Sequence, residues 1–188
     1  TFSHSSMAFG VIGNNPDVVS HLAAYGAKVD VRLGAGSDTP LTLAINAKNM
    51  PMVMQLLALG ANPNGIQGVS NGAPLRAALR VQDDTLVQTL IEAGAQADYT
   101  DRFNQSILHS AVCVNSPQAI ALLITHGADV NRQCKVNGRY TTPLINSIRF
   151  RKEENAEVVR LLLEAGANPA TKDAAGKTAL DYAKEKGF

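Results

Sequence analysis

Histidine and cysteine are the residue types in this sequence best suited to metal binding or nucleophilic catalysis. The four histidines are His4, His21, His109 and His126. None lies within metal-ligand spacing of another histidine or of a cysteine pair. An enzyme needs a nucleophile, a base or a metal that converge on one pocket. We therefore expect no catalytic residue, no metal site and no cofactor, and a protein that is not an enzyme.

The two cysteines, Cys113 and Cys134, leave two interpretations open. They could form a disulfide in an oxidising compartment. Two free thiols are the favoured interpretation, because nothing else in the sequence indicates a disulfide framework.

Two short motifs resemble chemical signatures but lack the context that such signatures need. The segment "GAGSD" at 34–38 has the start of a glycine-rich phosphate loop, yet the third glycine is absent and no strand precedes it. We interpret it as part of a surface loop. The segment "NQS" at 104–106 matches an acceptor for N-glycosylation, a pattern short enough to arise by chance.

A recurring pattern organises the whole chain. One copy opens with "TPLTLA" at 39–44 and closes with "LGANPN" at 59–64. From the second residue of each opening segment to the next closing glycine, the intervals are 20, 20, 20, 20 and 23 residues. The closing glycines are Gly26, Gly60, Gly94, Gly127 and Gly166. So regular a period predicts one structural repeat that stacks along the chain.

Each copy carries signals for two helices. Threonine or serine precedes the first helix as an N-cap, at Thr39, Ser106, Thr142 and Thr178. Proline follows at the first helical position, at Pro40, Pro74 and Pro143. The first helix of the second copy should span about residues 40–47, and the second helix of each copy should end at the closing glycine.

Apolar residues three to four positions apart predict the buried faces of these helices. In the first helix of the second copy they are Leu41, Leu43 and Ala44. In the second helices they are Val53, Leu56 and Leu57, then Val87, Leu90 and Ile91, then Val159, Leu162 and Leu163.

The Thr-Pro-Leu-x-x-Ala opening and the Gly-Ala-(Asp/Asn) closing resemble the ankyrin repeat, from about Ser5 to Phe188. The resemblance implies an all-α fold, an ankyrin-repeat solenoid of stacked helix-turn-helix units with β-hairpin-like fingers. It also implies that His109, in "SILHSA", is structural and bonds to the backbone. We expect a single domain over residues 1–188, with repeats at roughly 3–36, 37–70, 71–103, 104–139 and 140–175 and a partial cap at 176–188.

Composition limits the classes of partner. The 188 residues carry a formal net charge of +1, which argues against the dominant basic face of a nucleic-acid binder. No apolar stretch approaches the 18 residues of a membrane span. We expect a monomer that binds another protein. The chain begins at Thr1, either as a trimmed piece or after removal of a signal, so the compartment stays open between cytoplasm and periplasm or secretion.

The resemblance places partner contacts on a concave face made by the fingers and by the exposed ends of the first helices. These ends are Ile12 and Gly13, Asn46 and Ala47, Arg80 and Val81, Cys113 and Val114, and Arg149 and Phe150. The candidate partner-binding residues, with the fingers included, are Arg80, Val81, Tyr99, Arg102, Phe103, Val114, Arg132, Lys135, Arg139, Tyr140, Arg149, Phe150 and Arg151. The alternative is that the valines pack laterally against neighbouring repeats.

The fifth repeat holds two insertions. The finger before it, "NRQCKVNGRYTT", is long and contains an Asn-Gly pair that favours a tight hairpin. The turn "RFRKEEN" between its helices exceeds the other turns by three residues, and we expect an added near-turn of helix that carries Phe150, Arg151 and Lys152 outward. We expect a partner with an acidic patch and an apolar notch that receives Phe150 and Tyr140. Tolerated surface insertions are the alternative.

The predicted function is a non-enzymatic protein-binding module that uses the groove and fingers of the third to fifth repeats. Two alternatives remain. The chain could be an inhibitor or immunity-type protein that blocks a partner enzyme, for example a bacterial cell-wall hydrolase. It could also be the ankyrin segment of a larger effector or enzyme.

Overall fold

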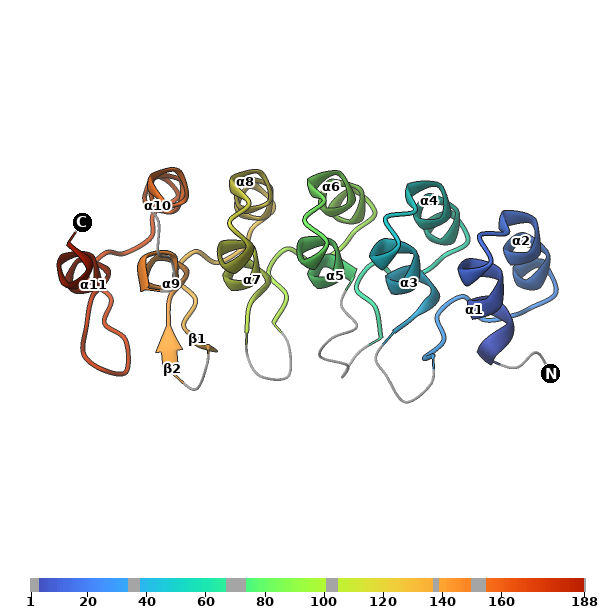
Figure 1. Ribbon diagram of the computed structural model, residues 1–188, viewed down its shortest axis with the longest axis horizontal. Helices are drawn as coiled ribbons and strands as arrows, with labels where there is room; N and C mark the ends of the chain where they lie inside the picture. Colours follow the sequence, from blue (N-terminus) through green and yellow to red (C-terminus); the bar gives the residue numbers. More distant parts are fainter. Residues whose placement is uncertain are drawn as a thin grey trace. The chain divides into compact units, whose positions relative to one another are not determined.

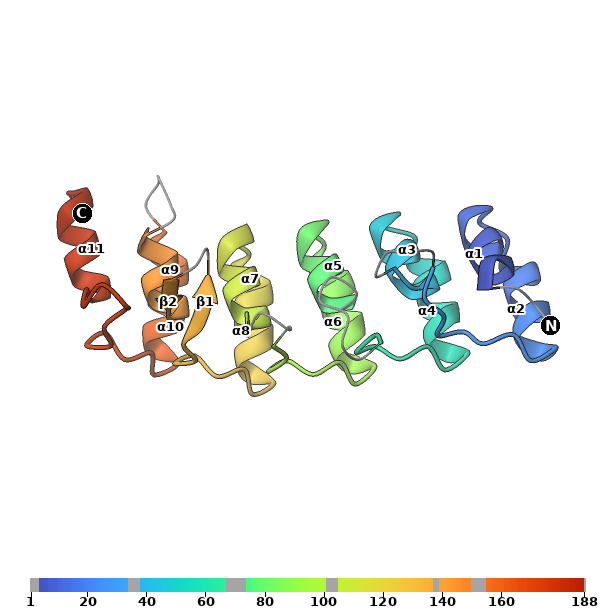
Figure 2. The same cartoon turned by 90° about the horizontal axis from the view of Figure 1, so that it is seen from below.

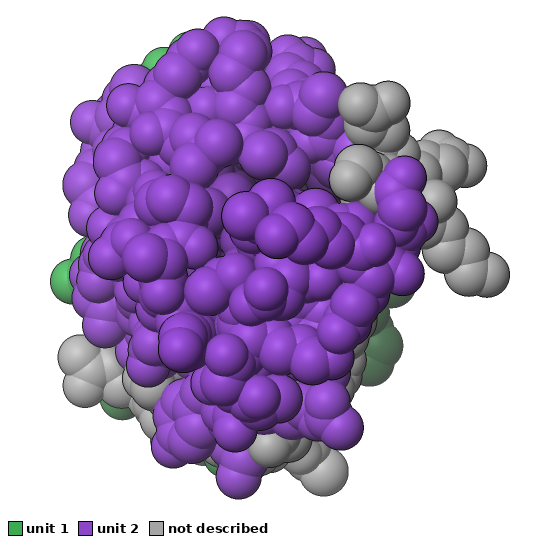
Figure 3. Space-filling view, turned by 90° about the vertical axis from the view of Figure 1, so that its left-hand side faces the viewer, with its two compact units in different colours: residues 1–96 green, residues 97–188 purple. Residues whose placement is uncertain are grey.

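The computed structural model describes residues 4–33, 38–66, 74–100, 105–136, 139–149 and 155–187. The chain forms two compact units, residues 1–96 and 97–188, which Figure 3 shows in separate colours. The boundary between them lies shortly after the closing glycine Gly94, where the sequence predicts the link between the third and fourth repeats. The single domain expected over residues 1–188 stays a prediction.

Unit 1 consists of three helix pairs in two layers. The helices are α1 (His4–Ile12), α2 (Pro16–Ala24), α3 (Pro40–Asn46), α4 (Met50–Ala58), α5 (Pro74–Arg80) and α6 (Asp84–Glu92). The first helices of the repeats, α1, α3 and α5, lie side by side, and α2, α4 and α6 form the second layer (Figures 1 and 2).

Unit 2 repeats this arrangement and adds a hairpin. Its elements are α7 (Ile107–Val114), α8 (Pro117–Thr125), β1 (Cys134–Val136), β2 (Arg139–Thr141), α9 (Pro143–Arg149), α10 (Ala156–Glu164) and α11 (Ala179–Lys186). The antiparallel strands β1 and β2 extend from the side of the first helices, away from α8 and α10 (Figure 1). The helix pairs and the hairpin have the all-α, helix-turn-helix architecture with a hairpin-like finger that the sequence predicts.

The helix signals act as the sequence predicts. The Thr39 hydroxyl accepts a hydrogen bond from the Thr42 amide at 3.2 Å, and the Thr42 hydroxyl accepts one from the Thr39 amide at 2.7 Å. This reciprocal capping box satisfies two amides that have no partner within the helix. The closing glycines all have positive φ, for example +87° at Gly60. This backbone conformation is unfavourable for residues that have a Cβ atom.

The second helices bury the predicted faces except near the end of the chain. Val53, Leu56, Val87, Leu90 and Ile91 are buried. Leu57 is half-buried, as is Leu43 in the first layer.

In α10 the expected set is partly wrong. Val158 and Leu162 are buried, whereas Val159 is half-buried and Leu163 is 43% exposed. The corresponding residues of α6, Val87 and Ile91, are buried. α10 differs because α11 is the only helix described after it, and no further second helix covers that side of α10 within the described residues.

A ladder of side chain-to-backbone hydrogen bonds connects successive repeats within each unit. In each case the acceptor is the side chain of the residue four positions after one closing glycine. The donor is the backbone amide of the residue two positions after the closing glycine of the next repeat. In unit 1 the carboxylate of Asp30 accepts from the Asn62 amide at 3.0 Å, and the side-chain oxygen of Asn64 accepts from the Gln96 amide at 2.7 Å. In unit 2 the same bonds run to Asp98 from Asp129 and to Asn131 from Asn168.

Asparagine gives this ladder a second bond that aspartate cannot make. The side-chain amide of Asn131 also donates to the Gly166 carbonyl at 3.0 Å, and that of Asn64 donates to the Gly94 carbonyl at 3.2 Å. An ionised carboxylate only accepts hydrogen bonds. The Asp or Asn of the closing pattern therefore holds the following repeat at its helix C-terminus.

Two replacements of Asn131 distinguish how much each of its two hydrogen bonds contributes to stability. We expect Asn131→Ala to lower the free energy of unfolding of the protein by about 1–2 kcal/mol, and Asn131→Asp by about half as much because it keeps the acceptor. Urea denaturation followed by circular dichroism measures both. Gln133→Ala is the control, since Gln133 is exposed in the same finger; an Asn131→Ala variant as stable as this control would contradict the ladder's role.

Candidate protein-binding surface

The ends of the first helices in unit 1 are exposed as expected, with one exception. Ile12, Asn46 and Arg80 are exposed, whereas Val81 is half-buried. The Arg80 guanidinium donates to the Asn46 side-chain oxygen at 2.8 Å, which links the ends of α3 and α5. Arg80 thus presents a positive charge at a defined position on this surface.

The hairpin of unit 2 presents three candidate residues together. In its register Cys134 pairs with Thr141, Lys135 with Tyr140, and Val136 with Arg139. Side chains alternate between the two faces of a strand, and directly opposed residues share a face. Cys134 and Thr141 are buried, so Lys135 and Tyr140 lie side by side on the outer face, where Tyr140 is 51% exposed. Arg139, at the start of β2, is also exposed, although alternation places it on the same face as Thr141.

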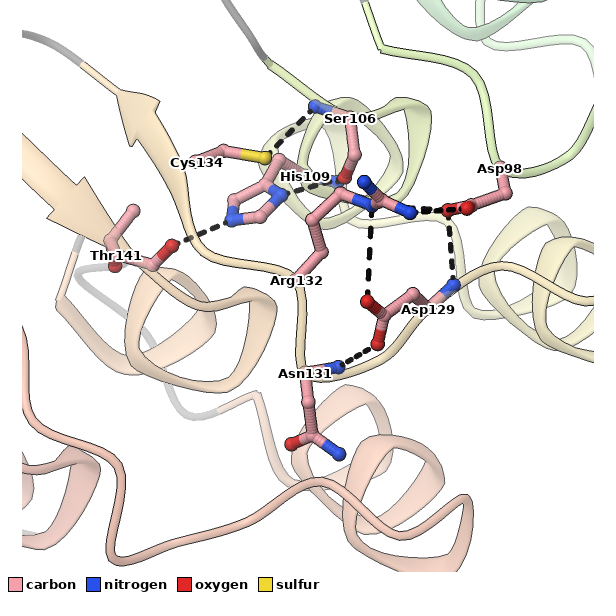
Figure 4. A network of polar contacts seen from close by, with 8 residues as sticks. All are labelled: Asp98, Ser106, His109, Asp129, Asn131, Arg132, Cys134 and Thr141. Atoms are coloured by element: carbon pink, nitrogen blue, oxygen red, sulfur yellow. Dashed lines mark hydrogen bonds and ion pairs between the residues drawn. The ribbon is translucent and has the colours of Figure 1, made fainter.

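A buried polar network fixes the inner face of the hairpin to α7 (Figure 4). The Cys134 sulfur accepts from the Ser106 amide at 3.3 Å. The His109 ring lies 3.1 Å through Nε2 from the Thr141 carbonyl and 2.7 Å through Nδ1 from the Ser106 hydroxyl. A carbonyl only accepts, so Nε2 carries the proton and Nδ1 accepts from the hydroxyl in the neutral ring. His109 is structural and bonded to the backbone, as the resemblance implies.

The Ser106–His109 contact has the length of a nucleophile–base pair but not its surroundings. Both side chains are buried. The second nitrogen of the ring bonds to a carbonyl rather than to the carboxylate that orients a catalytic histidine. The Ser106 hydroxyl is also the N-cap of α7 and accepts from the His109 amide at 3.3 Å. This geometry stabilises the finger and gives a substrate no access to the hydroxyl.

Burial gives His109 an unusual protonation equilibrium. Removal of the imidazole from water lowers the pKa of His109 from 6.5 to about 4, against the opposing effect of the Thr141 hydrogen bond and with a smaller lowering from Arg132. The ring is therefore neutral in the folded protein at neutral pH, in the tautomer that the network requires.

Arg132 does not project from the finger as the sequence suggested. Its guanidinium forms an ion pair with Asp98, donates through Nε to the same carboxylate at 3.2 Å, and lies 3.9 Å from Asp129 (Figure 4). The carboxylate of Asp98 is the ladder residue of the third repeat's closing turn, so Arg132 braces the finger. Among the described residues of the hairpin, the exposed positive charge comes from Lys135 and Arg139.

Arg149 also has structural contacts that its position in the sequence does not reveal. It is half-buried, with its guanidinium carbon 5.5 Å from the centre of the Tyr182 ring, and Lys177 lies 5.4 Å from the same ring. The Tyr182 hydroxyl donates to Asp173 at 2.6 Å. Cation–π contacts of this kind fix a charged side chain over a ring, so Arg149 packs against α11.

The remaining candidates divide between the finger base, the end of α7 and segments outside the described residues. Tyr99 and Val114 are half-buried, and the Tyr99 carbonyl accepts from the Ile107 amide at 3.0 Å. The four candidates outside the described residues are Arg102, Phe103, Phe150 and Arg151. The near-turn of helix expected over Phe150–Lys152, most of "GAGSD" and the Asn137–Gly138 turn lie there too.

The structure adds two findings on chemistry. Cys113 is exposed and Cys134 is buried, and neither forms a disulfide, as the favoured interpretation held. Within the described ranges, no group of three His, Cys, Asp or Glu side chains could hold a metal ion. No helix there is long and apolar enough to cross a membrane.

Comparisons with known proteins identify the class. A model of three ankyrin repeats matches residues 108–188, and a model of one ankyrin repeat matches residues 37–67. The crystal structure of EF0377, an ankyrin repeat protein, superposes with a TM-score of 0.85 at 22% identity and covers 100% of this chain and 94% of its own. The chain belongs to the ankyrin-repeat family, whose members generally mediate protein–protein interaction and whose fold is typically a non-catalytic binding module.

The curated relatives share only part of their length with this chain. The E3 ubiquitin-protein ligase hecd-1 of Caenorhabditis elegans is 35% identical over 47% of the chain, which is 3% of that protein. Ankyrin repeat and SOCS box protein 6 of Homo sapiens is 38% identical over 40% of the chain, 17% of that protein. The chain thus resembles a small part of each.

The neutral buried state of His109 predicts a pH dependence of stability. The unfolded chain binds a proton at His109 below pH 6.5, whereas the folded chain does so only near pH 4. Falling pH therefore favours unfolding, and we expect a loss of about 3 kcal/mol in the free energy of unfolding between pH 6.5 and 4.

Urea denaturation at several pH values measures this loss. His109→Gln is the control, because glutamine can donate to the Thr141 carbonyl but does not titrate. The pH slope should be shallower in this variant, and an equal slope in both proteins would show that His109 is not responsible.

Proposed function

We propose that this chain is a protein-binding module whose principal contact surface is the outer face of the β1–β2 hairpin in unit 2. The observation that supports this most is the pairing of Lys135 and Tyr140 on a face that a buried network holds from behind. Neither side chain is needed for that network, so both are available to a partner.

The chemistry of this face favours a particular kind of partner. Tyr140 offers a large, half-exposed aromatic surface, and tyrosine is frequent among the residues that dominate binding energy. Lys135 places a positive charge beside it, and Arg139, the neighbour of Tyr140 in β2, adds an exposed positive charge to the hairpin. An acidic patch next to an apolar notch complements this combination of charge and shape.

Rigidity of the finger supports tight binding. A loop that must become ordered on binding loses conformational entropy and weakens the complex. Here Cys134 and Thr141 hold both strands against α7 before a partner arrives. The proposal extends this surface to Val114 at the end of α7, and to Phe150 and Arg151 from the inserted turn of the same repeat.

The biological effect of binding has two forms in this proposal. A scaffold leaves its partner active, whereas an inhibitor of the kind considered above abolishes the partner's activity. The relatives' descriptions as an E3 ubiquitin-protein ligase and a SOCS box protein are consistent with ankyrin repeats serving as a binding part of larger proteins. Because the chain spans so little of them, their activities are not assigned to it.

Alanine replacement tests the surface. We expect the double variant Tyr140→Ala with Phe150→Ala to weaken partner binding by at least about 2 kcal/mol, because large aromatic anchors dominate interface energy. The partner is first captured from the native source, and calorimetry then compares the affinities. Tyr25→Ala in unit 1 is the matched control, since Tyr25 is an aromatic residue that is 76% exposed. Unchanged affinity in a folded double variant would exclude this surface.

A further inference from the structure

A groove in unit 1 lies apart from the hairpin surface and has a different character. It has a volume of about 440 Å³ and opens to solvent between α1 and α3. Its lining residues are Val11, Ile12, Asn14, Leu43, Ala44, Ala47 and Asn49. The walls are thus mainly aliphatic, and the described part of the lining includes no charged side chain.

A small residue, Ala47, lines the groove just after the end of α3. Gly13 and Ala47 occupy the position that directly follows each first helix in the first and second repeats. The corresponding residues of the third and fourth repeats are Val81 and Val114, each with a branched side chain. A valine at position 47 would add volume to the wall of the groove that Ala47 lines.

The polar groups of the groove are already hydrogen-bonded to each other. The side-chain amide of Asn49 donates to the side-chain oxygen of Asn14 at 2.7 Å, and the Asn49 oxygen accepts from the Met52 amide at 3.2 Å. Ile12, by contrast, is 69% exposed beside the hollow. Such a site is suited to an apolar group, because a polar one would lose its hydrogen bonds to water without replacement.

Exposed basic residues stand at the ends of the first helices next to the groove's lining residues, and the exposed acidic residue Asp17 lies in the first turn of α2. Among the helix ends and turns at 12–14, 46–48 and 80–82, the only charged residues are Lys48 and Arg80, and both are exposed. Arg80 donates to Asn46, the chain neighbour of the lining residue Ala47. The acidic Asp83 follows this set, but its side chain caps α6 by accepting from the Leu86 amide.

We propose that this groove binds one large apolar side chain from a protein segment that carries carboxylates on either side of it. The apolar side chain enters the hollow between α1 and α3, and the carboxylates meet Lys48 and Arg80. This inference rests on the proposed protein-binding function but adds a second site with its own ligand chemistry. The partner contributes the apolar group here, whereas at the hairpin Tyr140 contributes it.

Synthetic peptides test this site directly, although the natural partner is unidentified. The probe is a fluorescein-labelled peptide with a central Glu-Phe-Glu and neutral Ser and Gly flanks. The comparison peptides carry Lys-Phe-Lys or Glu-Ala-Glu at the centre. We expect the Glu-Phe-Glu peptide to bind and to shift the amide NMR signals of α1 and α3. Both comparison peptides should bind at least about tenfold more weakly.

The decisive variant is Ala47→Val, which introduces the residue that the third and fourth repeats have at this position. The affinity for the Glu-Phe-Glu peptide should fall at least about tenfold, while the thermal unfolding temperature stays close to that of the wild type. Ile12→Asn, which copies Asn46 of the second repeat, provides a second test if Ala47→Val does not fold. Met54→Ala on the exposed side of α4 is the control and should leave affinity unchanged.

Each outcome bears on one proposal only. No shift of α1 and α3 signals at about 1 mM peptide, or equal affinity of wild type and Ala47→Val, would overturn the groove site. Shifts confined to the hairpin would overturn it as well, but would leave the hairpin proposal standing. The variant Lys135→Ala with Tyr140→Ala should keep full affinity for the peptide, because it alters only the hairpin.

Discussion

The closing turn of each repeat depends on a side chain supplied by the repeat before it. A helix C-terminus leaves carbonyls without partners, and the turn that follows leaves an amide without one. The side chains of Asn64 and Asn131 each satisfy two such groups. The side-chain oxygen accepts from a backbone amide, and the side-chain nitrogen donates to a glycine carbonyl. Since one small repeat cannot bury its apolar faces alone, these bonds and the stacked helices act together to set the register of neighbours.

The same dependence explains how the finger of unit 2 becomes a rigid platform. Asp98 of the preceding turn holds Arg132, and the Ser106–His109 pair holds Cys134 and Thr141. These contacts use one face of the hairpin and leave the other free. Buried and exposed residues therefore alternate between Thr141 and Tyr140, and between Cys134 and Lys135, as the β-conformation imposes. The buried, neutral His109 links the stability of this platform to pH.

The two proposed surfaces lie where the repeats differ from one another rather than where they share the pattern. Ala47 lines the groove of unit 1 at a position where the third and fourth repeats have Val81 and Val114, and the insertions of the fifth repeat lengthen a finger and a turn. Residues that keep the repeats together are constrained by packing, so these variable positions are where specificity can arise. The two surfaces offer a partner different chemistry. The hairpin presents an aromatic side chain with a basic neighbour, whereas the groove in unit 1 is an apolar hollow.

The sequence by itself determined the repeat, its helices and its caps, because those features depend on local patterns such as Thr39 before Pro40 and glycine at positive φ. It also indicated the hairpin and the structural role of His109. Only the tertiary structure decided the roles of Arg132 and Arg149, since their partners Asp98 and Tyr182 lie more than thirty residues away in the chain. Exposure at a helix end or finger tip follows from local pattern, but whether a charge there is already paired depends on neighbours that only the folded chain brings close.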